Sequence, residues 1–376
     1  MSRVANRGEW SESYAAMRIV ADRKLYVADR DGKKNEDEWM SLIELIRHET
    51  TKRVVKYRYS CDETDVVISV DSKVIKTVKV SDFDKVAKEL IKEIQSAKTS
   101  PFSLTSDLDH KLFDLEVQKT KAQGQSKDDV TLSIRDPRSG VTRRNIGFSI
   151  KSEIGSPPTL FNAARASAAE FLLPGFSSAD AERINSIVSA KGKRLVRDRW
   201  LAINGLCSPK FIGFRYSRKM GCRPFNENLE LINPRLVNVL AFILDAIFAK
   251  RCESMRISDI AEFLTKENPL KLNRPAEKYS YMLKNFLYAS YCGLTATKFW
   301  DGLSEVNGGF IRISPQGEVL AFYALESDKF KQYLYDNCYL TTPSTSETHG
   351  DYGEVFTDEL GRFMFRLNFQ IRYALR

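Results

Sequence analysis

The stretch RNIGFSIKSEIGSPPTLFNAA, residues 144–164, decides how this sequence is interpreted. Apolar Ile146, Phe148 and Ile150 alternate with small or charged residues, and this period of two predicts a β-strand with one buried face. The other face carries Ser149 and Lys151. A lysine at the end of such a strand is either solvated or directed at a negatively charged group, and the strand alone does not distinguish the two.

A second strand is predicted immediately before this one. Residues 130–134 alternate in the same way, and the turn sequence PRSG at 137–140 separates the two runs. Strands that are close in sequence usually pair, so we expect an antiparallel hairpin with Asp129 at the start of its first strand.

The surrounding pattern predicts an α+β protein. Helices are expected at residues 8–21, 36–48, 82–95 (capped by Ser81 and Asp84), 160–172, 233–250, 258–267 and 276–291. Strands are expected at 52–59, 65–70 and 72–80 as a meander, around a turn at 307–309, and as one long final strand at 363–375. We therefore predict a mixed sheet flanked by helices in residues 1–185 and a helix-rich part in residues 186–376. The final strand is a candidate to pack back on the first part.

Composition narrows the class of partner. The chain has 376 residues, enough for two domains, and a net charge of +9 that favours a polyanion, most commonly nucleic acid. Six scattered cysteines and three histidines lack the spacing of a zinc site or a disulfide framework. The N-terminus lacks the apolar run that is typical of a secretory signal, and the apolar run at 236–249 is too short to span a bilayer. We expect a cytoplasmic protein that does not bind membranes.

Asp129 and Lys151 together suggest phosphodiester chemistry. Hydrolysis with Mg²⁺ needs carboxylates to hold the ion beside the phosphate, and a lysine can orient the nucleophile and stabilise developing charge. Glu9 and Glu12, three residues apart on the first predicted helix, offer further carboxylates. An acid at one strand end, followed on the adjacent strand by a second acid, any residue and a lysine, is the pattern of the PD-(D/E)XK nuclease fold. As a pattern it is weak, and the alternative is a turn-capping Asp129 with a solvated Lys151.

Three segments resemble the HpaII family of type II restriction endonucleases: GEWSESY at 8–14, IGFSIKSEIGSPPTLFNA at 146–163 and RLNFQIRYA at 366–374. The resemblance implies a PD-(D/E)XK fold and Mg²⁺-dependent double-strand cleavage of DNA at a short GC-rich palindrome, CCGG in the enzyme that names the family. It also implies a prokaryotic source and a functional partner, a cytosine methyltransferase encoded nearby. A palindromic site suits a two-fold dimer, although a monomer can also act on it.

The resemblance also assigns roles to residues. Asp129 is the expected principal metal ligand, Lys151 the motif lysine, and the backbone carbonyl of Ile150 a second ligand. Ser149 departs from the pattern, because the fold usually has a carboxylate there. The missing charge is expected from Glu153, Glu12 or Glu9, among which we favour Glu12; for Glu9 and Glu12 the alternative is a favourable interaction with the helix N-terminus.

DNA contacts are expected in two places. Residues 155–162 precede a predicted helix whose N-terminus suits a phosphate, although a rigid turn is an equal alternative. Residues 191–223 hold ten Lys or Arg against one acid, interleaved with aromatic residues, and arginine suits guanine. The alternative for this run is a solvated face. The candidates are Ser156, Thr159 and Asn162 in the first place and Arg197, Arg199, Arg215, Arg218 and Lys219 in the second.

Two other functions remain open at this stage. Helices at 258–267 and 276–291 followed by a hairpin at 307–309 have the order of a winged helix, which would suit a sequence-specific DNA-binding regulator without nuclease activity. A repair nuclease of the same fold would cut by DNA structure instead of sequence. Cleavage of a plasmid into discrete fragments would exclude the repair nuclease.

Overall fold

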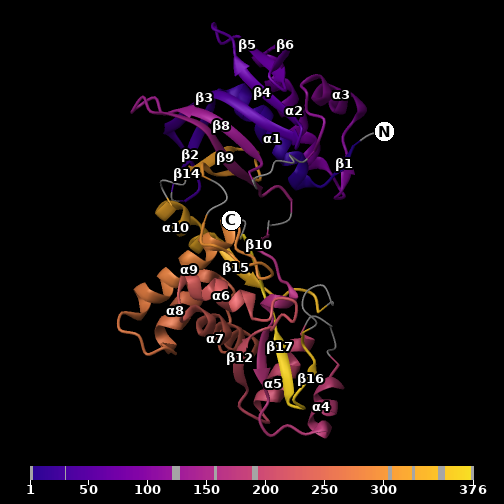
Figure 1. Cartoon of the computed structure of the whole chain (residues 1–376), viewed down its shortest axis with the longest axis vertical. Helices are drawn as coiled ribbons and strands as arrows, with labels where there is room; N and C mark the ends of the chain where they lie inside the picture. The colour runs from indigo at the N-terminus through magenta and orange to yellow at the C-terminus, as the bar shows by residue number, and fades with distance from the viewer. Residues whose placement is uncertain are drawn as a thin grey trace. The chain divides into compact units, whose positions relative to one another are not determined.

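The computed structural model describes residues 3–29, 31–120, 128–155, 159–188, 194–303, 307–323, 327–345 and 352–373. Its helices and sheets confirm the α+β class. The chain forms two compact units: Met1–Pro158 with Glu305–Tyr333 (unit 1), and Thr159–Ser304 with Leu334–Arg376 (unit 2). The predicted division between residues 185 and 186 is therefore wrong. A segment near residue 310 returns to the first unit, where its orange ribbon lies among indigo and magenta strands (Figure 1).

Unit 1 is built on a nine-stranded mixed sheet with the order β2-β14-β13-β9-β8-β3-β4-β5-β6. Only β13 with β9 and β14 with β2 pair in parallel, among the strands that the structure describes. The elements of this unit are β1 (Val4–Ala5), α1 (Arg7–Asp22), β2 (Lys24–Ala28), β3 (Lys34–Thr50), β4 (Arg53–Tyr59), β5 (Asp65–Val70), β6 (Lys73–Lys79), α2 (Val80–Ser96), β7 (Phe102–Ser103), α3 (Ser106–Asp114), β8 (Val130–Arg135), β9 (Thr142–Ser152), β13 (Gly309–Ile313), β14 (Val319–Tyr323) and the first part of α10 (Ser327–Asn337).

Several local predictions are confirmed and two are wrong. The meander β4-β5-β6 forms as expected, and α1 and α2 cover the predicted helices. The predicted helix at 36–48 is instead the long strand β3, because β2, β8 and β4 all pair with it and Leu42 and Leu45 enter the core. The predicted cap of α2 by Ser81 does not form, since the helix begins at Val80.

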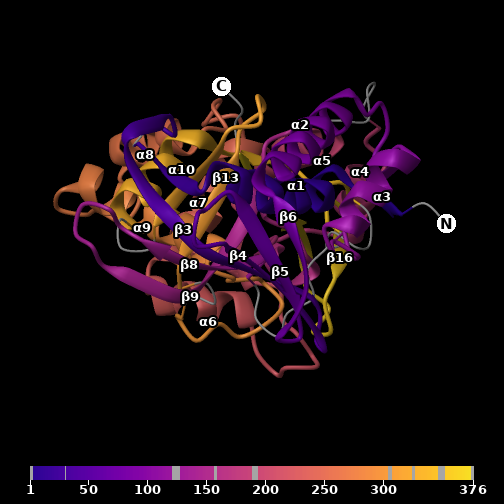
Figure 2. The same cartoon turned by 90° about the horizontal axis from the view of Figure 1, so that it is seen from above.

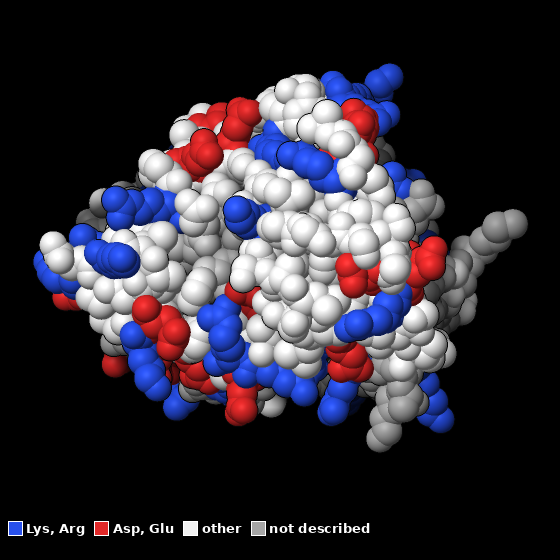
Figure 3. Space-filling model, turned by 90° about the horizontal axis from the view of Figure 1, so that it is seen from below, with Lys and Arg blue, Asp and Glu red and all other residues white. Residues whose placement is uncertain are grey.

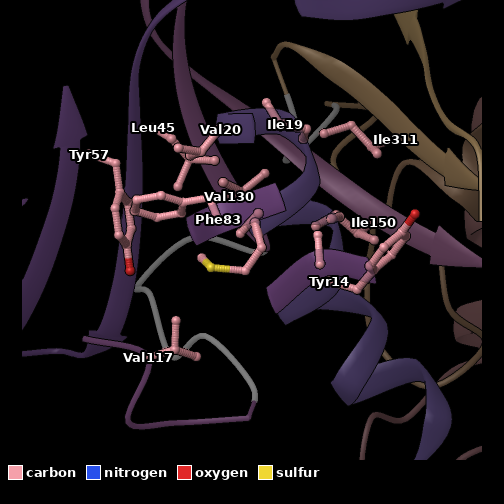
Figure 4. Close-up of a cluster of buried hydrophobic side chains, with 14 of the residues drawn as sticks. Tyr14, Ile19, Val20, Leu45, Tyr57, Phe83, Val117, Val130, Ile150 and Ile311 are labelled. Carbon is pink, nitrogen blue, oxygen red and sulfur yellow. The ribbon is translucent and has the colours of Figure 1, made fainter. Parts of the chain in front are cut away.

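The core of unit 1 lies between the sheet and helices α1 and α2, which pack along each other (Figure 2). Tyr14 and Ile19 of α1 meet Val130 of β8 and Ile150 of β9 in one buried cluster (Figure 4). Burial of such side chains contributes about 1.5–3 kcal/mol each. The helix face of the hairpin β8–β9 is therefore fixed by packing, which leaves the opposite face to carry polar groups.

Unit 2 combines two small sheets, β10-β18-β15 and β12-β11-β17-β16, with helices. Phe161 packs against both Phe225 and Phe369, at ring-centroid distances of 5.2 and 5.3 Å, which joins a strand, a helix and the C-terminal segment. Its elements are β10 (Thr159–Phe161), the 3₁₀ turn Arg165–Ser167, β11 (Ala169–Leu172), α4 (Ser178–Asn185), α5 (Leu195–Asn204), β12 (Lys210–Phe214), α6 (Pro224–Ile232), α7 (Leu236–Phe248), α8 (Ile257–Glu267), α9 (Pro275–Tyr291), β15 (Cys338–Thr341), β16 (Val355–Thr357), β17 (Phe363–Leu367) and β18 (Gln370–Tyr373).

Helices α7, α8 and α9 confirm three predictions, whereas the predicted helix at 160–172 is wrong because β10 and β11 occupy it. The single final strand is also wrong: it is broken into β17 and β18, and each pairs with a strand of unit 2. Among the described residues, no single helix is long and apolar enough to cross a membrane. Helices α6 and α7 meet such a criterion only as a pair bent by 111°.

Among the described residues, the elements expected to form a winged helix are divided between the two units. Residues 307–309 do not make the expected turn: the Asn307 side chain accepts from Gly147 N at 2.8 Å, and Gly308 N donates to Gly147 O at 2.9 Å. The strands that would be the wing, β13 and β14, belong to the sheet of unit 1, while α8 and α9 belong to unit 2.

Candidate active site

The predicted hairpin β8–β9 is antiparallel, with Val130 opposite Phe148. Asp129, one residue before β8, donates its backbone N–H to Phe148 O at 2.9 Å. Its side-chain Oδ2 accepts from Ser149 Oγ at 3.1 Å and from Ile150 N at 2.6 Å. The hairpin thus brings Asp129 against the residues that precede Lys151, as its register requires.

The backbone of β9 directs the Ile150 carbonyl toward Asp129. Gly147 O accepts from Gly308 N, and Glu153 N donates to Ile313 O, so odd-numbered residues of β9 bond toward β13. In a strand the N–H and C=O of one residue point to the same side, so both groups of Ile150 point toward the side of β8, at the end where Asp129 precedes that strand. A carboxylate and a backbone carbonyl are the oxygen donors that Mg²⁺ accepts, so this pair fits the ion in kind.

Lys151 is half-buried and shares the sheet face of Ser149, opposite to the apolar Phe148 and Ile150. In register with it on the neighbouring parallel strand stands Arg312. The charged face of the hairpin therefore continues onto β13, which the sequence did not predict because β13 lies far along the chain.

Glu153 is engaged inside unit 1. Its side chain is 5 % exposed and accepts from Arg312 Nε at 2.8 Å and Nη2 at 2.6 Å, and its Oε1 also accepts from Tyr333 OH at 2.9 Å. Burial lowers the pKa of Arg312 and the hydrogen bonds to Glu153 raise it, with a net rise. Arg312 also donates to Gly32 O at 2.7 Å. Both Glu153 oxygens are thus held by neighbours, which argues against the expected metal contact.

Glu9 and Glu12 differ in their surroundings. Glu9 forms a capping box with Asn6: Asn6 N donates to Glu9 Oε2 at 3.0 Å, and Glu9 N donates to the Asn6 side chain at 2.9 Å. Glu12 is half-buried on the next turn, beside Ser11, whose hydroxyl donates to Ser152 Oγ at 2.9 Å. Helix α1 therefore lies against the end of β9, through the face opposite to Lys151.

Asp128 is a carboxylate that the sequence interpretation missed. Its Oδ2 accepts from Thr131 Oγ1 at 2.6 Å, while its Oδ1 is buried without a hydrogen-bond partner among the described residues. It lies over Gly147, where an added Cβ would come within 2.8 Å of the Asp128 Cβ. The sequence shows two adjacent acids, Asp128 and Asp129, and a glycine two residues before Ser149. Only the fold shows that Asp128 and Gly147 lie against each other.

The acids do not form a large cluster. In the part of the chain that the structure describes, no group of three His, Cys, Asp or Glu side chains is placed to hold a metal ion. A magnesium site here would use few protein ligands, which matches the ion's usual habit of keeping several waters.

Two of the three residues expected to contact DNA near 155–162 are described by the structure. Ser156 lies outside the described residues. Thr159 begins strand β10 and is half-buried, and Asn162 is exposed just after that strand. Because no helix begins here, the argument from a helix N-terminus no longer applies.

The basic run 191–223 is dispersed by the fold. Arg199 is 6 % exposed and donates to Gly353 O at 2.7 Å and Asn185 O at 2.6 Å, so its guanidinium is used inside unit 2 and its predicted DNA contact is not supported. Arg197 lines a separate cavity of about 250 Å³ beside the end of α7. Lys219 is exposed, next to Arg218.

Arg215 and Arg218 line a larger groove of about 810 Å³ in unit 2, called here the arginine groove. Its lining includes six arginines and three acids: Arg165, Arg215, Arg218, Arg223, Arg362, Arg366, Glu170, Asp358 and Glu359. Figure 3 shows one face of the molecule, on which basic and acidic side chains are interspersed around a largely uncharged centre. The sequence run located part of this groove and missed the arginines that come from distant strands.

A mixed sheet with an aspartate, a carbonyl and a lysine at one hairpin end, in a chain that also has an arginine groove, suits an enzyme that acts on nucleic acid. The chain belongs to the HpaII restriction endonuclease family, whose model matches residues 6–373. The type II restriction enzyme HpaII of Haemophilus parainfluenzae is 30 % identical over 371 residues, which cover 98 % of each chain. No solved structure matches the chain significantly. Family membership makes this protein a site-specific hydrolase of double-stranded DNA in a restriction–modification system, and it disfavours the regulator and the repair nuclease.

Proposed function

We propose that this enzyme uses Mg²⁺ to cut both strands of DNA at a short GC-rich palindrome, with CCGG as the first sequence to test. We further propose that unit 1 is a PD-(D/E)XK nuclease core and that unit 2 contributes to DNA recognition. The observation that carries the proposal is the end of the hairpin β8–β9, where Asp129 faces Ser149 and Ile150 immediately before Lys151.

Asp129 and the carbonyl of Ile150 would hold the ion, and the hydroxyl of Ser149 orients the Asp129 carboxylate by donating to it. Bound magnesium supplies positive charge that polarises the phosphate and lowers the pKa of a water. The ammonium group of Lys151 would orient the attacking water and stabilise the charge that develops on the phosphate oxygens.

A second carboxylate is needed where Ser149 replaces the usual acid. Glu12 remains our first candidate from the sequence, although α1 meets β9 through the face opposite to Lys151, so Glu12 would have to reach the ion around the end of the strand. Asp128 is added as a competitor, since it neighbours Asp129 and has a buried oxygen without a described partner. Glu153 and Glu9 rank lower, because Arg312 and Asn6 already hold them.

The cellular setting follows from the same proposal. The enzyme would act in the prokaryotic cytoplasm, as a monomer or a homodimer, beside a cytosine methyltransferase that protects the host sequence. The methyltransferase is a functional partner and makes no contact that the proposal requires.

The test is digestion of a plasmid of known sequence by the full chain with Mg²⁺, followed by sequencing of the ends. We expect discrete fragments whose ends share one short palindrome, and no cleavage after chelation by EDTA. Asp129→Ala should abolish cleavage, whereas Asp62→Ala, a change of an exposed acid in the β4–β5 turn, should leave it intact. A random smear, or normal cleavage by Asp129→Ala, would contradict the proposal.

A further inference from the structure

The arginine groove of unit 2 is a built site in which the fold fixes part of the charge. Glu170 of β11 is 7 % exposed and lies between two of the arginines. It accepts from Arg223 Nη1 at 2.8 Å and from Arg366 Nε and Nη2 at 3.1 and 3.0 Å. Burial of a carboxylate is costly unless it is paired, so these two arginines are held firmly in place.

The backbone makes room for this arrangement. Gly213 of β12 lies opposite Glu170, and a Cβ there would come within 2.9 Å of Arg223 Cδ. On the other side, the Arg366 guanidinium lies 3.8 Å from the centroid of the Phe356 ring. Arg366 is thus fixed along one edge by Glu170 and on one face by an aromatic ring, while it still lines the groove.

Other arginines of the groove are held only loosely. Arg218 pairs with Glu359, and Arg362 pairs with Asp358, but the arginine side chains are 82 % and 44 % exposed. Exposed ion pairs contribute at most about 1 kcal/mol, so a stronger anion can compete for these arginines. The groove therefore combines two kinds of arginine. Arg223 and Arg366, which Glu170 holds, form its floor, and the exposed Arg218 and Arg362 form its rim.

We propose that the arginine groove holds the DNA duplex, with Arg218 and Arg362 on phosphates and Arg366 on a base edge. This inference rests on the proposed function, because it takes double-stranded DNA as the substrate. A guanidinium fixed by a carboxylate loses little conformational entropy on binding, and the Arg366 N–H donors that Glu170 does not take, on Nη1 and Nη2, match O6 and N7 of guanine. The exposed arginines Arg218 and Arg362 supply the salt-dependent, sequence-independent part of the affinity.

The first experiment measures binding of the full chain to a labelled 30-bp duplex of mixed sequence by fluorescence anisotropy, with Ca²⁺ in place of Mg²⁺. The variant Arg218→Ala/Arg362→Ala should raise Kd by about tenfold at low salt and reduce the slope of log K against log salt by about 2. Binding should weaken for every sequence alike, because phosphates are the contacts removed.

The matched control is Arg251→Ala/Arg274→Ala in the same unit. Arg251 and Arg274 are 42 % and 75 % exposed and pair with Asp245 and Glu277, but they do not line the groove. The control should change Kd by less than about twofold. Equal effects of the two double variants would overturn the proposal. If the unmodified chain failed to bind any duplex, the proposed function itself would fail, which is a distinct result.

The second experiment separates the floor from the rim. Arg366→Lys keeps the positive charge beside Glu170 but removes the planar fork. We expect binding to the mixed-sequence duplex within about threefold of the unmodified chain, and a fall of about tenfold or more in the rate of plasmid cleavage. The unfolding midpoint of the variant shows whether the fold survives. Cleavage at the normal rate with an unchanged fragment pattern would remove Arg366 from base recognition.

Discussion

At the scale of single residues, the two groups singled out first are placed by one short piece of backbone. Asp129 and Lys151 lie at the same end of the β8–β9 hairpin because the register pairs Val130 with Phe148. Alternation and a turn sequence were enough to predict that much. The roles of the surrounding acids were harder to predict from the sequence. Glu153, for example, is hydrogen-bonded by Arg312, which lies on a strand that begins only at Gly309.

We expect Lys151→Ala to lower the rate of DNA cleavage by about 10²-fold or more, because a preorganised charge beside the phosphate would be lost. Binding to DNA in Ca²⁺ should change much less. Lys151→Arg should not restore the rate, since the guanidinium fork differs in shape from an ammonium group. Single-turnover cleavage and anisotropy measure the two quantities separately, and a normal rate in Lys151→Ala would remove the lysine from the reaction.

The identity of the second acid can be settled by three glutamine or asparagine changes. If Glu12 completes the site, Glu12→Gln should lose cleavage by about 10²-fold without unfolding, and Asp128→Asn should be mild. The opposite ranking would place the displaced carboxylate beside Asp129. Binding of Tb³⁺, followed by its luminescence, reports on the metal independently of cleavage.

Unlike Glu12→Gln and Asp128→Asn, Glu153→Gln should mainly affect the stability of the fold. It leaves Arg312 without its buried partner, so the free energy of unfolding should fall by about 3 kcal/mol. A urea titration measures this loss. Unchanged stability combined with loss of Tb³⁺ binding would instead show that Glu153 leaves Arg312 to hold the metal.

At the scale of elements, the local sequence pattern predicted the helices and strands correctly wherever tertiary packing favours the same structure. The amphipathic helices α1 and α2 and the meander β4-β5-β6 were all predicted, because their apolar spacing agrees with their final environment. Residues 36–48 were predicted as a helix because their charged residues obscure the alternation. They became strand β3 through pairing with β2, β4 and β8, which come from elsewhere in the sequence.

The hairpin itself gives a prediction at this scale. Gly147→Ala would put a methyl group 2.8 Å from the Asp128 Cβ and 3.0 Å from its Cγ, so Asp128 would have to move. We expect cleavage to fall by about tenfold or more while the unfolding midpoint changes little, because the residue lies at the polar face of the sheet. Gly205→Ala is the control for the same chemical change, because Gly205 has an ordinary φ of −75° and its added Cβ would meet only Ala202 O at 3.4 Å and Leu201 O at 3.8 Å. Equal cleavage by both variants would show that Asp128 does not need its present position.

At the scale of the whole molecule, the stability of unit 1 should depend on pH in the alkaline range. Burial raises the pKa of Tyr14 to about 12, and burial also raises the pKa values of Tyr57 and Tyr59. A group whose pKa is raised on folding stabilises the fold fully below its unfolded pKa, near 10, and loses that contribution as the pH rises through its folded pKa. The free energy of unfolding should therefore fall between pH 10 and 12, on the order of 1 kcal/mol per pH unit for each such tyrosine.

Urea titrations at pH 9 and 11 measure this fall. Tyr14→Phe should reduce it, since one of the titrating groups is gone, whereas a change of the exposed Tyr281 to Phe should not. Equal pH dependence of Tyr14→Phe and the unmodified protein would contradict the assignment.

The division of the chain was the least predictable feature at this scale. Composition changes near residue 185, but β13 and β14 complete the sheet of unit 1 from beyond residue 305. The arginine groove was likewise only half visible, because Glu170, Arg223 and Arg366 come together from three separate segments. The periodicity of a sequence indicates only local structure, whereas the unit boundary and the arginine groove both depend on contacts between distant segments.

The return of β13 has a consequence for how the enzyme is made. A chain synthesised from its N-terminus exposes β9 as a sheet edge until residues 309–313 have left the ribosome, because β13 is its parallel neighbour. Until Arg312 has been synthesised, Glu153 also lacks its ion-pair partner, so strand β9, which carries Lys151, reaches its final surroundings late. A nascent or prematurely terminated polypeptide that stops before residue 309 therefore carries Asp129 and Lys151 in an unfinished sheet, which is completed only after residues 309–313 have been synthesised.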